Sequence, residues 1–323
     1  MSARASTMRA TRSAGCSYLM CSQSLMDEVW SLVRTAVVAE RQGLSCRDRG
    51  DTAPMLTRAQ DAPTVEVTDR EFGRLRMMNL ALAVLHLTSG VLMLVLSNGF
   101  EMTISSFSIG GPPGTDPTDG VVSDVWSYPL GPAVATFAFL SALFHLVVAL
   151  PPGATAYRRE LEHGRNRFRW VEYSLSATLM IVIIANITGI TDMAALIAIA
   201  AANVAMILFG WVMEVVNPPD RDVWWGPFWF GCIAGAAPWI AIVATLVYGV
   251  TSVDGAEGPP TFVYGIIVSI FVLFNCFAVN QWLQYRRVGK WRDYLVGERT
   301  YGVLSLVAKT ALAWQIFANV LVG

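Results

Sequence analysis

The sequence is short of charge. Only 15% of its 323 residues are Asp, Glu, Lys or Arg, whereas a soluble globular domain carries about 25%. Hydrophobic residues make up 54% of the chain and gather in several long runs. This combination excludes an ordinary soluble domain and predicts a protein that crosses a membrane several times.

Lysine and metal-binding patterns are also scarce. The chain has two lysines, Lys290 in a polar, arginine-rich stretch and Lys309 in an apolar one. The five cysteines follow no metal-binding spacing and require no disulfide. The net charge of −1 identifies no partner, because the charges are segregated along the chain. We expect no metal site and no nucleic-acid partner.

The first 65 residues differ from the rest. They are rich in Arg and Ser, have no acidic residue before Asp27 and contain no apolar span. A transit peptide has this composition. So does a disordered leader, and so does a start codon placed too far upstream, with Met55 as the true start and Met1 as the extended one. These alternatives stay open, and residues 66–323 are taken as the membrane domain.

Seven apolar runs after residue 66 are long enough to cross a bilayer, which takes about 20 helical residues. We therefore predict an all-α bundle of seven membrane helices. The predicted spans are Met77–Asn98, Pro129–Leu150, Trp170–Ile190, Asp192–Val215, Val223–Gly249, Pro260–Tyr285 and Tyr301–Val322.

Positive charges between the spans lie on one side of the predicted membrane. After residue 66, fourteen Lys and Arg residues lie before the first span or in the second, fourth and sixth connections. The first, third and fifth connections hold no Lys or Arg, and seven acidic residues lie on that side, counting Asp192 at the start of the fourth span. Because positively charged loops stay inside, this split predicts a multi-pass protein of the cell membrane with a cytoplasmic N-terminus and an extracellular C-terminus.

The first connection, residues 99–128, is long and rich in Gly and Pro. Two runs of strand-forming residues, MTISSFSI and VVSDVWSY, flank the turn segment IGGPPGTDPTDG. This pattern predicts an extracellular β-hairpin. A connection of this length is more often functional than idle, so we expect it to cover the outer mouth of the bundle or to contact another subunit.

Lys309 is the most unusual residue of the chain. It lies about 10 positions past Arg299, which places it ~15 Å into the last span and near the middle of a ~30 Å hydrocarbon core. A charged amine there costs several kcal/mol unless it is paired or chemically altered. A buried lysine loses its proton readily and is then a nucleophile toward aldehydes. We therefore predict a functional site at this residue.

Glu172 is the candidate partner of Lys309, with Ser176 one turn further along the third span. Residue counting places Glu172 ~10 Å shallower than Lys309, although the lysine side chain leans toward that depth. The alternative is an interfacial carboxylate paired with a nearby arginine. Ser305 lies four residues before Lys309, on the same helix face.

Other polar residues of the spans receive simpler interpretations. Glu214 is expected at the membrane interface, and Asp192 is expected to cap the N-terminus of the fourth helix. His86 and His145 lie on adjacent helices, where a histidine is more often a satisfied polar residue than a titrating one. We interpret them as one shared polar network, too small for a convincing metal site.

Aromatic and small residues alternate along the last four spans. This pattern is typical of ordinary membrane-bundle packing with tryptophans at the interface. It also suits an elongated apolar slot beside Lys309, wide enough for a polyene. The pattern alone does not choose between the two.

Seven spans with an amine in the middle of the last resemble a retinal-binding rhodopsin, and among these the chain resembles the heliorhodopsins. The segments that carry the resemblance are RWVEYSLSATLMIVIIANITGITD, FNCFAVNQWLQY and YGVLSLVAKTALAWQIFANVL. It covers about residues 70–322. The inverted topology and the long first connection match the same family.

The resemblance implies all-trans retinal bound covalently to Lys309 as a protonated Schiff base. It implies Glu172 as the counterion, with Ser305 and Ser176 close to the amine. The other residues that it implies around the chromophore are Leu179, Asn203, Met206, Gly210, Pro238, Trp239, Phe274 and Trp314.

The resemblance also implies a polar network on the inner side of the Schiff base. Its members would be His86, His145, Ser141 and Ser89, where Ser89 stands in place of an expected glutamine. The first connection would help to build a homodimer in the lipid membrane.

The implied function is light sensing by a receptor that is not an enzyme. Between Glu172 and Asp192 the third span has no second carboxylate, where a proton pump would place a donor or acceptor. We therefore expect a slow photocycle without net ion transport, and a signal to an unidentified cytoplasmic partner. The alternatives are a light-driven proton transporter or channel, an enzyme that uses Lys309 covalently, and a light-dependent regulator of a bound soluble enzyme.

Overall fold

The computed structural model describes residues 65–219, 221–252 and 258–322. They belong to one compact unit of the chain, Ala62–Gly323. The predicted leader lies outside the described residues except for Val65, so its interpretation and the position of the start codon stay predictions.

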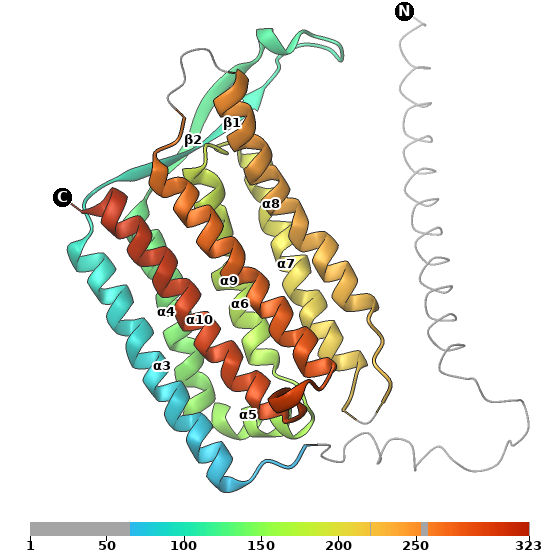
Figure 1. The fold of residues 1–323 in the computed structure, drawn as a ribbon. Helices are drawn as coiled ribbons and strands as arrows, with labels where there is room; N and C mark the ends of the chain where they lie inside the picture. The colour runs from blue at the N-terminus through green and yellow to red at the C-terminus, as the bar shows by residue number, and fades with distance from the viewer. Residues whose placement is uncertain (1–64, 220, 253–257, 323) are drawn as a thin grey trace, which may run out of the picture. The chain divides into compact units, whose positions relative to one another are not determined.

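Seven long helices lie side by side in the described part of the chain (Figure 1), and each is apolar and long enough to cross a membrane. The predicted seven-helix bundle is confirmed. Its helices are α3 (Asp69–Leu96), α4 (Leu130–Ala149), α6 (Arg167–Ile187), α7 (Met193–Val216), α8 (Gly226–Ser252), α9 (Thr261–Tyr285) and α10 (Tyr294–Ile316), which continues as a π-helical turn through Leu321.

Three helices begin earlier than predicted: α6 by three residues, and α3 and α10 by more. Helix α3 begins eight residues before Met77, because Thr68 and Glu71 form a reciprocal capping box. Helix α10 begins seven residues before Tyr301, because the Asp293 carboxylate accepts the backbone N–H of Leu295 at 2.8 Å. Hydropathy placed both starts after the last charged residue, but the backbone stays helical through the charged turns.

The two ends of the bundle differ (Figure 1). One end carries the short helix α5 (Gly153–Glu162) and the 3₁₀ turn η2 (Gly289–Arg292), and is called the α5 end below. The other end carries strands β1 (Glu101–Ser108) and β2 (Val121–Pro129), and is called the hairpin end. The sequence had not indicated α5.

Strands β1 and β2 pair as an antiparallel hairpin with an irregularity between Ile104 and Ser105. This confirms the predicted hairpin, whose turn includes the short 3₁₀ helix η1 (Pro117–Asp119). Its use in a homodimer stays a prediction.

The hairpin is fixed to the start of α7. The backbone N–H of Ser105 donates to the carbonyl of Thr191 at 2.9 Å. Asp192 caps α7 as predicted, accepting the N–H of Ala195 at 2.9 Å, and it also accepts the N–H of Phe107 at 3.3 Å. These backbone donors lower the pKa of the Asp192 carboxyl.

The bundle interior is apolar toward the hairpin end and polar toward the α5 end. Phe137, Ile184, Ile270 and Leu312 are almost fully buried in the apolar core. Many aliphatic side chains point outward instead, as a lipid-facing surface requires. Buried charged side chains occupy the α5 half, and they position the site described next.

Candidate functional site

Lys309 lies at the centre of the last span, at position 16 of the 28 residues Tyr294–Leu321. Its side chain is 4% exposed. The ammonium donates to Oε1 of Glu172 at 3.0 Å and to Oγ of Ser305 at 2.7 Å. It also lies 5.1 Å from the ring centroid of Tyr173, within the range of a cation–π contact. The charge is thus paired and hydrogen-bonded, as burial requires.

Glu172 is held by α4 as well as by α10. Ser141 of α4 donates its hydroxyl to Oε1 of Glu172 at 2.6 Å, so this oxygen accepts from both Ser141 and Lys309. The expected difference in depth does not prevent the contact. The alternative partner, an arginine, is not used, because Arg169 binds two other carboxylates.

The two histidines stack beside this pair. The rings of His86 and His145 are 5.5 Å apart and nearly parallel, and Nδ1 of His145 lies 2.7 Å from Oδ1 of Asn79. Ser89 is buried one turn beyond His86. Within the described residues, Nε2 of His86 has no hydrogen-bond partner, and neither has the buried hydroxyl of Ser176. The residues predicted as an inner polar network therefore lie together, with spare hydrogen-bonding capacity.

A second buried charge cluster lies toward the α5 end. The guanidinium of Arg169 binds the carboxylates of both Glu214 and Glu298, and all three side chains are at most 6% exposed. Glu214 had been predicted at the interface. It is buried because Trp170 Nε1 and the backbone N–H of Asn166 also donate to it, at 2.6 and 2.9 Å.

Helix α5 completes this cluster. The hydroxyl of Tyr157 donates to Oε1 of Glu298 at 3.2 Å, and Nδ2 of Asn166 donates to the same oxygen at 2.5 Å. Burial, followed by the nearby Glu298 charge, raises the pKa of the Tyr157 hydroxyl well above its ordinary value. The phenol therefore stays neutral and keeps its role as a donor.

A small cavity of about 50 Å³ is lined by members of both charge clusters. Asn79, His145 and Glu172 line it together with Arg169 and Glu298, among apolar side chains. A cavity of this size has room for about one or two water molecules. Glu172, the partner of Lys309, and the cluster of Arg169 thus border the same small space.

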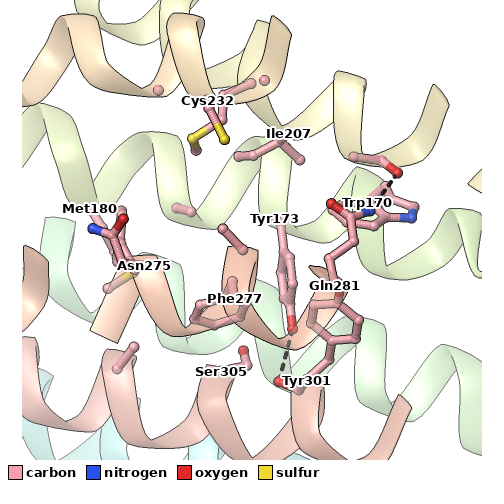
Figure 2. Close-up of a pocket in the computed structure, with 18 of the residues that line it drawn as sticks. Trp170, Tyr173, Met180, Ile207, Cys232, Asn275, Phe277, Gln281, Tyr301 and Ser305 are labelled. Atoms are coloured by element: carbon pink, nitrogen blue, oxygen red, sulfur yellow. Dashed lines mark hydrogen bonds between the residues drawn. The ribbon is translucent and has the colours of Figure 1, made fainter. Parts of the chain in front are cut away.

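A larger apolar cavity of about 300 Å³ opens beside Lys309 (Figure 2). Its walls come from α6, α7, α8, α9 and α10, with Tyr173, Trp239 and Phe277 among the aromatic side chains. Tyr173 points across it and donates its hydroxyl to the carbonyl of Tyr301 at 3.0 Å, as Figure 2 shows. Size and lining are typical of a small-molecule site.

Glycines let large side chains approach the helices that line the cavity. A Cβ on Gly210 would lie 2.4 Å from the Trp170 ring, and a Cβ on Gly235 would lie 2.3 Å from the sulfur of Met206. Both distances are shorter than any normal contact. These positions therefore require glycine for the present packing of α6, α7 and α8.

The cavity contains part of the predicted lining. The predicted residues that line it, besides Lys309, are Ser305, Met206, Gly210, Trp239 and Phe274. Five others do not line it: Ser176, Leu179, Asn203, Pro238 and Trp314. Leu179 and Trp314 pack against the apolar core, and Asn203 donates to Thr178 at 2.9 Å. The space extends toward the α5 end instead, because small residues of α8 and α9 face it there.

Sequence reasoning missed several residues of the site. Tyr301 precedes Ser305 by one turn and Lys309 by two, so helix periodicity could have placed it on the same face. Trp170 and Tyr173 are three residues apart, so they share one face of α6 beside Glu172. Glu298 lies three residues before Tyr301 on the same face, but the predicted span began after the last charged residue and so left it out.

Comparison with known proteins identifies this arrangement. The heliorhodopsin family model matches residues 75–321. The chain belongs to the heliorhodopsin family. A search of curated proteins found no match.

Solved structures show the same fold at low sequence identity. One is a light-driven proton pump from Leptosphaeria maculans, with a TM-score of 0.53 and 14% identity over 79% of this chain and 97% of the pump. Another is the transmembrane domain of a Salpingoeca rosetta rhodopsin phosphodiesterase, with a TM-score of 0.54 and 13% identity over 83% of this chain and 88% of that domain. This heliorhodopsin is therefore a multi-pass membrane protein with a microbial-rhodopsin fold, and a light-responsive, retinal-binding protein.

The residues present fit retinal. The cavity is apolar and aromatic, and one amine, that of Lys309, is among the residues that line it. A polyene suits the apolar walls, and an aldehyde suits the amine. In this heliorhodopsin Lys309 would hold the carbonyl end, and Met206, Trp239 and Phe274 would contact the chain of the ligand.

The Arg169 cluster yields a prediction about stability. Replacing Arg169→Gln leaves Glu214 and Glu298 buried without their counter-charge, which costs about 3–5 kcal/mol of folding stability. Arg167→Gln is the matched control, because Arg167 is half-exposed and lies 3.8 Å from Glu160. Thermal unfolding followed by circular dichroism should show a large loss for the first variant and little for the second. Equal melting curves would contradict a structural role for the cluster.

Proposed function

We propose that this heliorhodopsin is a photoreceptor with retinal in the all-trans form on Lys309, a slow photocycle and no net ion transport. The observation that carries the proposal is the ion pair of Lys309 and Glu172 at the centre of the bundle, beside an apolar cavity. It is a receptor rather than an enzyme in this proposal, and its output goes to a cytoplasmic partner.

Lys309 supports covalent attachment. Its amine is buried, adjoins the cavity and has one acidic and one hydroxyl neighbour. Lys309 would hold retinal through a C=N bond to the aldehyde carbon: the carbonyl oxygen would leave as water with two protons of the ammonium, and the third would stay on the nitrogen as a protonated Schiff base. The bound group supplies absorption of visible light and a change of shape on illumination.

Glu172 is the counterion in this proposal. A carboxylate 3.0 Å from the nitrogen favours the protonated form by direct charge attraction. Ser141 fixes the carboxylate from α4, and Ser305 fixes the nitrogen from within α10. The proton would move into the network of His145, Asn79 and His86, since these groups border the same polar region.

In this proposal, Trp170 and Tyr301 transmit a change in the shape of the apolar cavity to the Arg169 cluster. Both line the cavity, and both lie close to the Arg169 guanidinium, with ring centroids 4.8 and 4.0 Å from its central carbon. A change in the shape of the cavity therefore moves side chains that contact the Arg169 cluster. That cluster includes α5 through Tyr157, so the change reaches the end of the bundle.

The distribution of carboxylates supports the absence of transport. Within the spans, every Asp and Glu lies at the depth of Glu172 or nearer to the α5 end. From Lys309 toward the hairpin end, the described interior is mainly the apolar core. Within the described spans, a proton released at the site therefore meets buried carboxylates on one side only.

Our first prediction for this function concerns the pigment. Purified protein with added all-trans retinal should give a visible absorption band that Lys309→Ala removes and Lys290→Ala keeps, because Lys290 lies in the η2 turn away from the cavity. Glu172→Gln should shift the band strongly and weaken proton binding at the nitrogen at least about tenfold, since the counter-charge is lost. An absorption spectrum and its pH titration measure both effects.

Two outcomes would contradict this assignment. A folded wild-type protein without a visible band would exclude the retinal site. An unchanged band in Lys309→Ala would exclude Lys309 as the point of attachment.

The second prediction concerns transport. Illuminated cells that contain the pigment should show no change of external pH that a protonophore abolishes. A light-driven proton pump measured in the same way is the positive control. A protonophore-sensitive change in the cells with this heliorhodopsin would favour the alternative, a proton transporter or channel.

The third prediction concerns orientation. The connections at the α5 end carry the arginines, so this end is cytoplasmic in our proposal and the hairpin end is extracellular. With the five native cysteines replaced, Val122→Cys in the hairpin should react with an impermeant maleimide on intact cells. Lys290→Cys should react only after permeabilisation. The reverse pattern would overturn the orientation.

A further inference from the structure

Two residues, Tyr173 and Tyr301, line both cavities of the site. Lys309 lines the apolar cavity and Glu172 lines the small one, so the ion pair of these two residues reaches from one cavity to the other. Within the part of the chain that the structure describes, no other residue belongs to both linings. The two tyrosines therefore form the partition between the cavities.

One hydrogen bond joins the two halves of this partition. The hydroxyl of Tyr173 donates to the backbone carbonyl of Tyr301 at 3.0 Å, and the dashed line in Figure 2 marks this bond. In an α-helix the same carbonyl also accepts the N–H of Ser305, whose hydroxyl binds the Lys309 ammonium. The phenol of α6 is thus fixed to the turn of α10 that positions the amine.

The ring of Tyr173 is held by aromatic neighbours. It packs edge-on against Phe277, with the ring centroids 5.3 Å apart, and against Trp170 at 6.4 Å. The Lys309 nitrogen lies 5.1 Å from the centroid of the same ring. These contacts hold the ring between the cavities, and the hydrogen bond fixes the direction in which the hydroxyl points.

The two cavities suit different contents. Asn79, His145, Arg169 and Glu298 supply polar groups to the small cavity, which has room for about one or two water molecules. The larger cavity is lined mainly by apolar and aromatic side chains. Water hydrolyses a bond between an amine and an aldehyde carbon, so a site that keeps such a bond must exclude water from it. A partition between the two spaces meets this need.

We propose that Tyr173 is a positioning residue whose hydrogen bond to Tyr301 keeps water of the small cavity away from the carbon that retinal bonds to Lys309. The inference deepens the proposed function and rests on it, because it requires retinal on this amine. Glu172 stays in contact with the small cavity, so protons are exchanged there while the carbon stays dry. The partition thus separates proton transfer from hydrolysis.

The test removes the hydroxyl of Tyr173 and keeps its ring. Tyr173→Phe loses the hydrogen bond to the Tyr301 carbonyl, and Tyr173→Leu loses the ring as well. Tyr285→Phe is the matched control, because the Tyr285 hydroxyl also donates to a backbone carbonyl, that of Met213 at 3.2 Å, and Tyr285 lines neither cavity. Circular dichroism confirms that each variant is folded.

Hydroxylamine, added to the full pigment in the dark, probes how easily a small polar molecule reaches the bond. Its nitrogen attacks the carbon bonded to Lys309, the bond from that carbon to the lysine nitrogen breaks, and Lys309 leaves as the ammonium while retinal leaves as its oxime. The visible band is lost at the rate of this reaction. We expect a loss about fivefold faster or more in Tyr173→Phe, a larger effect in Tyr173→Leu, and a rate within about twofold of the wild type in Tyr285→Phe.

A second readout uses the protein without retinal. Hydrogen–deuterium exchange, followed by mass spectrometry, measures the protection of the backbone amides in residues 301–309 of α10. Tyr173→Phe should exchange faster than the wild type in this segment and at the wild-type rate in residues 193–202 of α7, which distinguishes a local opening from a general loss of stability. Tyr285→Phe should leave the α10 segment unchanged. This measurement also decides the question if a variant forms no pigment.

Two outcomes overturn the inference. One is a bleaching rate of Tyr173→Phe equal to that of the wild type, which would leave Tyr173 with a packing role only. The other is equal acceleration in Tyr173→Phe and Tyr285→Phe, which would show a general loosening of the bundle. A folded wild type without a visible band would overturn the proposed function itself, so the two failures are distinguishable.

Discussion

The structure depends on one buried ammonium in the middle of a membrane. An isolated charge at this depth is too costly to keep, so Lys309 requires Glu172, and Glu172 requires the hydroxyl of Ser141. These contacts join α4, α6 and α10, three helices that are far apart in sequence. The packing of the polar half of the bundle follows from the need to satisfy this single charge. The apolar half needs no such constraint and is filled by aliphatic and aromatic side chains.

A second charge cluster keeps the first one intact. Arg169 is three residues from Glu172 and would be a competing partner for it. Glu214 and Glu298 bind Arg169 instead, and Tyr301 and Trp170 cover it with their rings. Lys309 therefore has Glu172 and Arg169 has Glu214 and Glu298, and members of both clusters line one small cavity. A buried ion pair is weak evidence for stability, but separate partners for each cation let the charge at Lys309 change without releasing Arg169.

Much of the fold could be predicted from the sequence, because lipid allows few solutions. Apolar runs of sufficient length must be helices, and turn residues between two strand-like runs favour a hairpin. The sequence also showed that Lys309 lies in the middle of an apolar span. The starts of α3 and α10 could not be predicted, because the hydropathy pattern begins after the last charged residue whereas the helix begins at its capping residue. Glu214 was misjudged and Glu298 was missed because their burial depends on Arg169, which is more than 40 residues away in the sequence from each of them. The extent of the cavity depends on how side chains of α6 to α10 pack around it, which no local pattern specifies.

Helix α10 contributes side chains to both charge clusters. Glu298, Tyr301, Ser305 and Lys309 follow one another at intervals of three or four residues, so they share one helix face. From the α5 end inward, this face presents a carboxylate to Arg169, a phenol ring over the same guanidinium, a hydroxyl to the amine and then the amine itself. In the proposed function, a displacement at Lys309 would act along this row of side chains, which ends at Arg169. Because α10 begins seven residues before the apolar stretch, this row reaches the α5 end without a break in the helix.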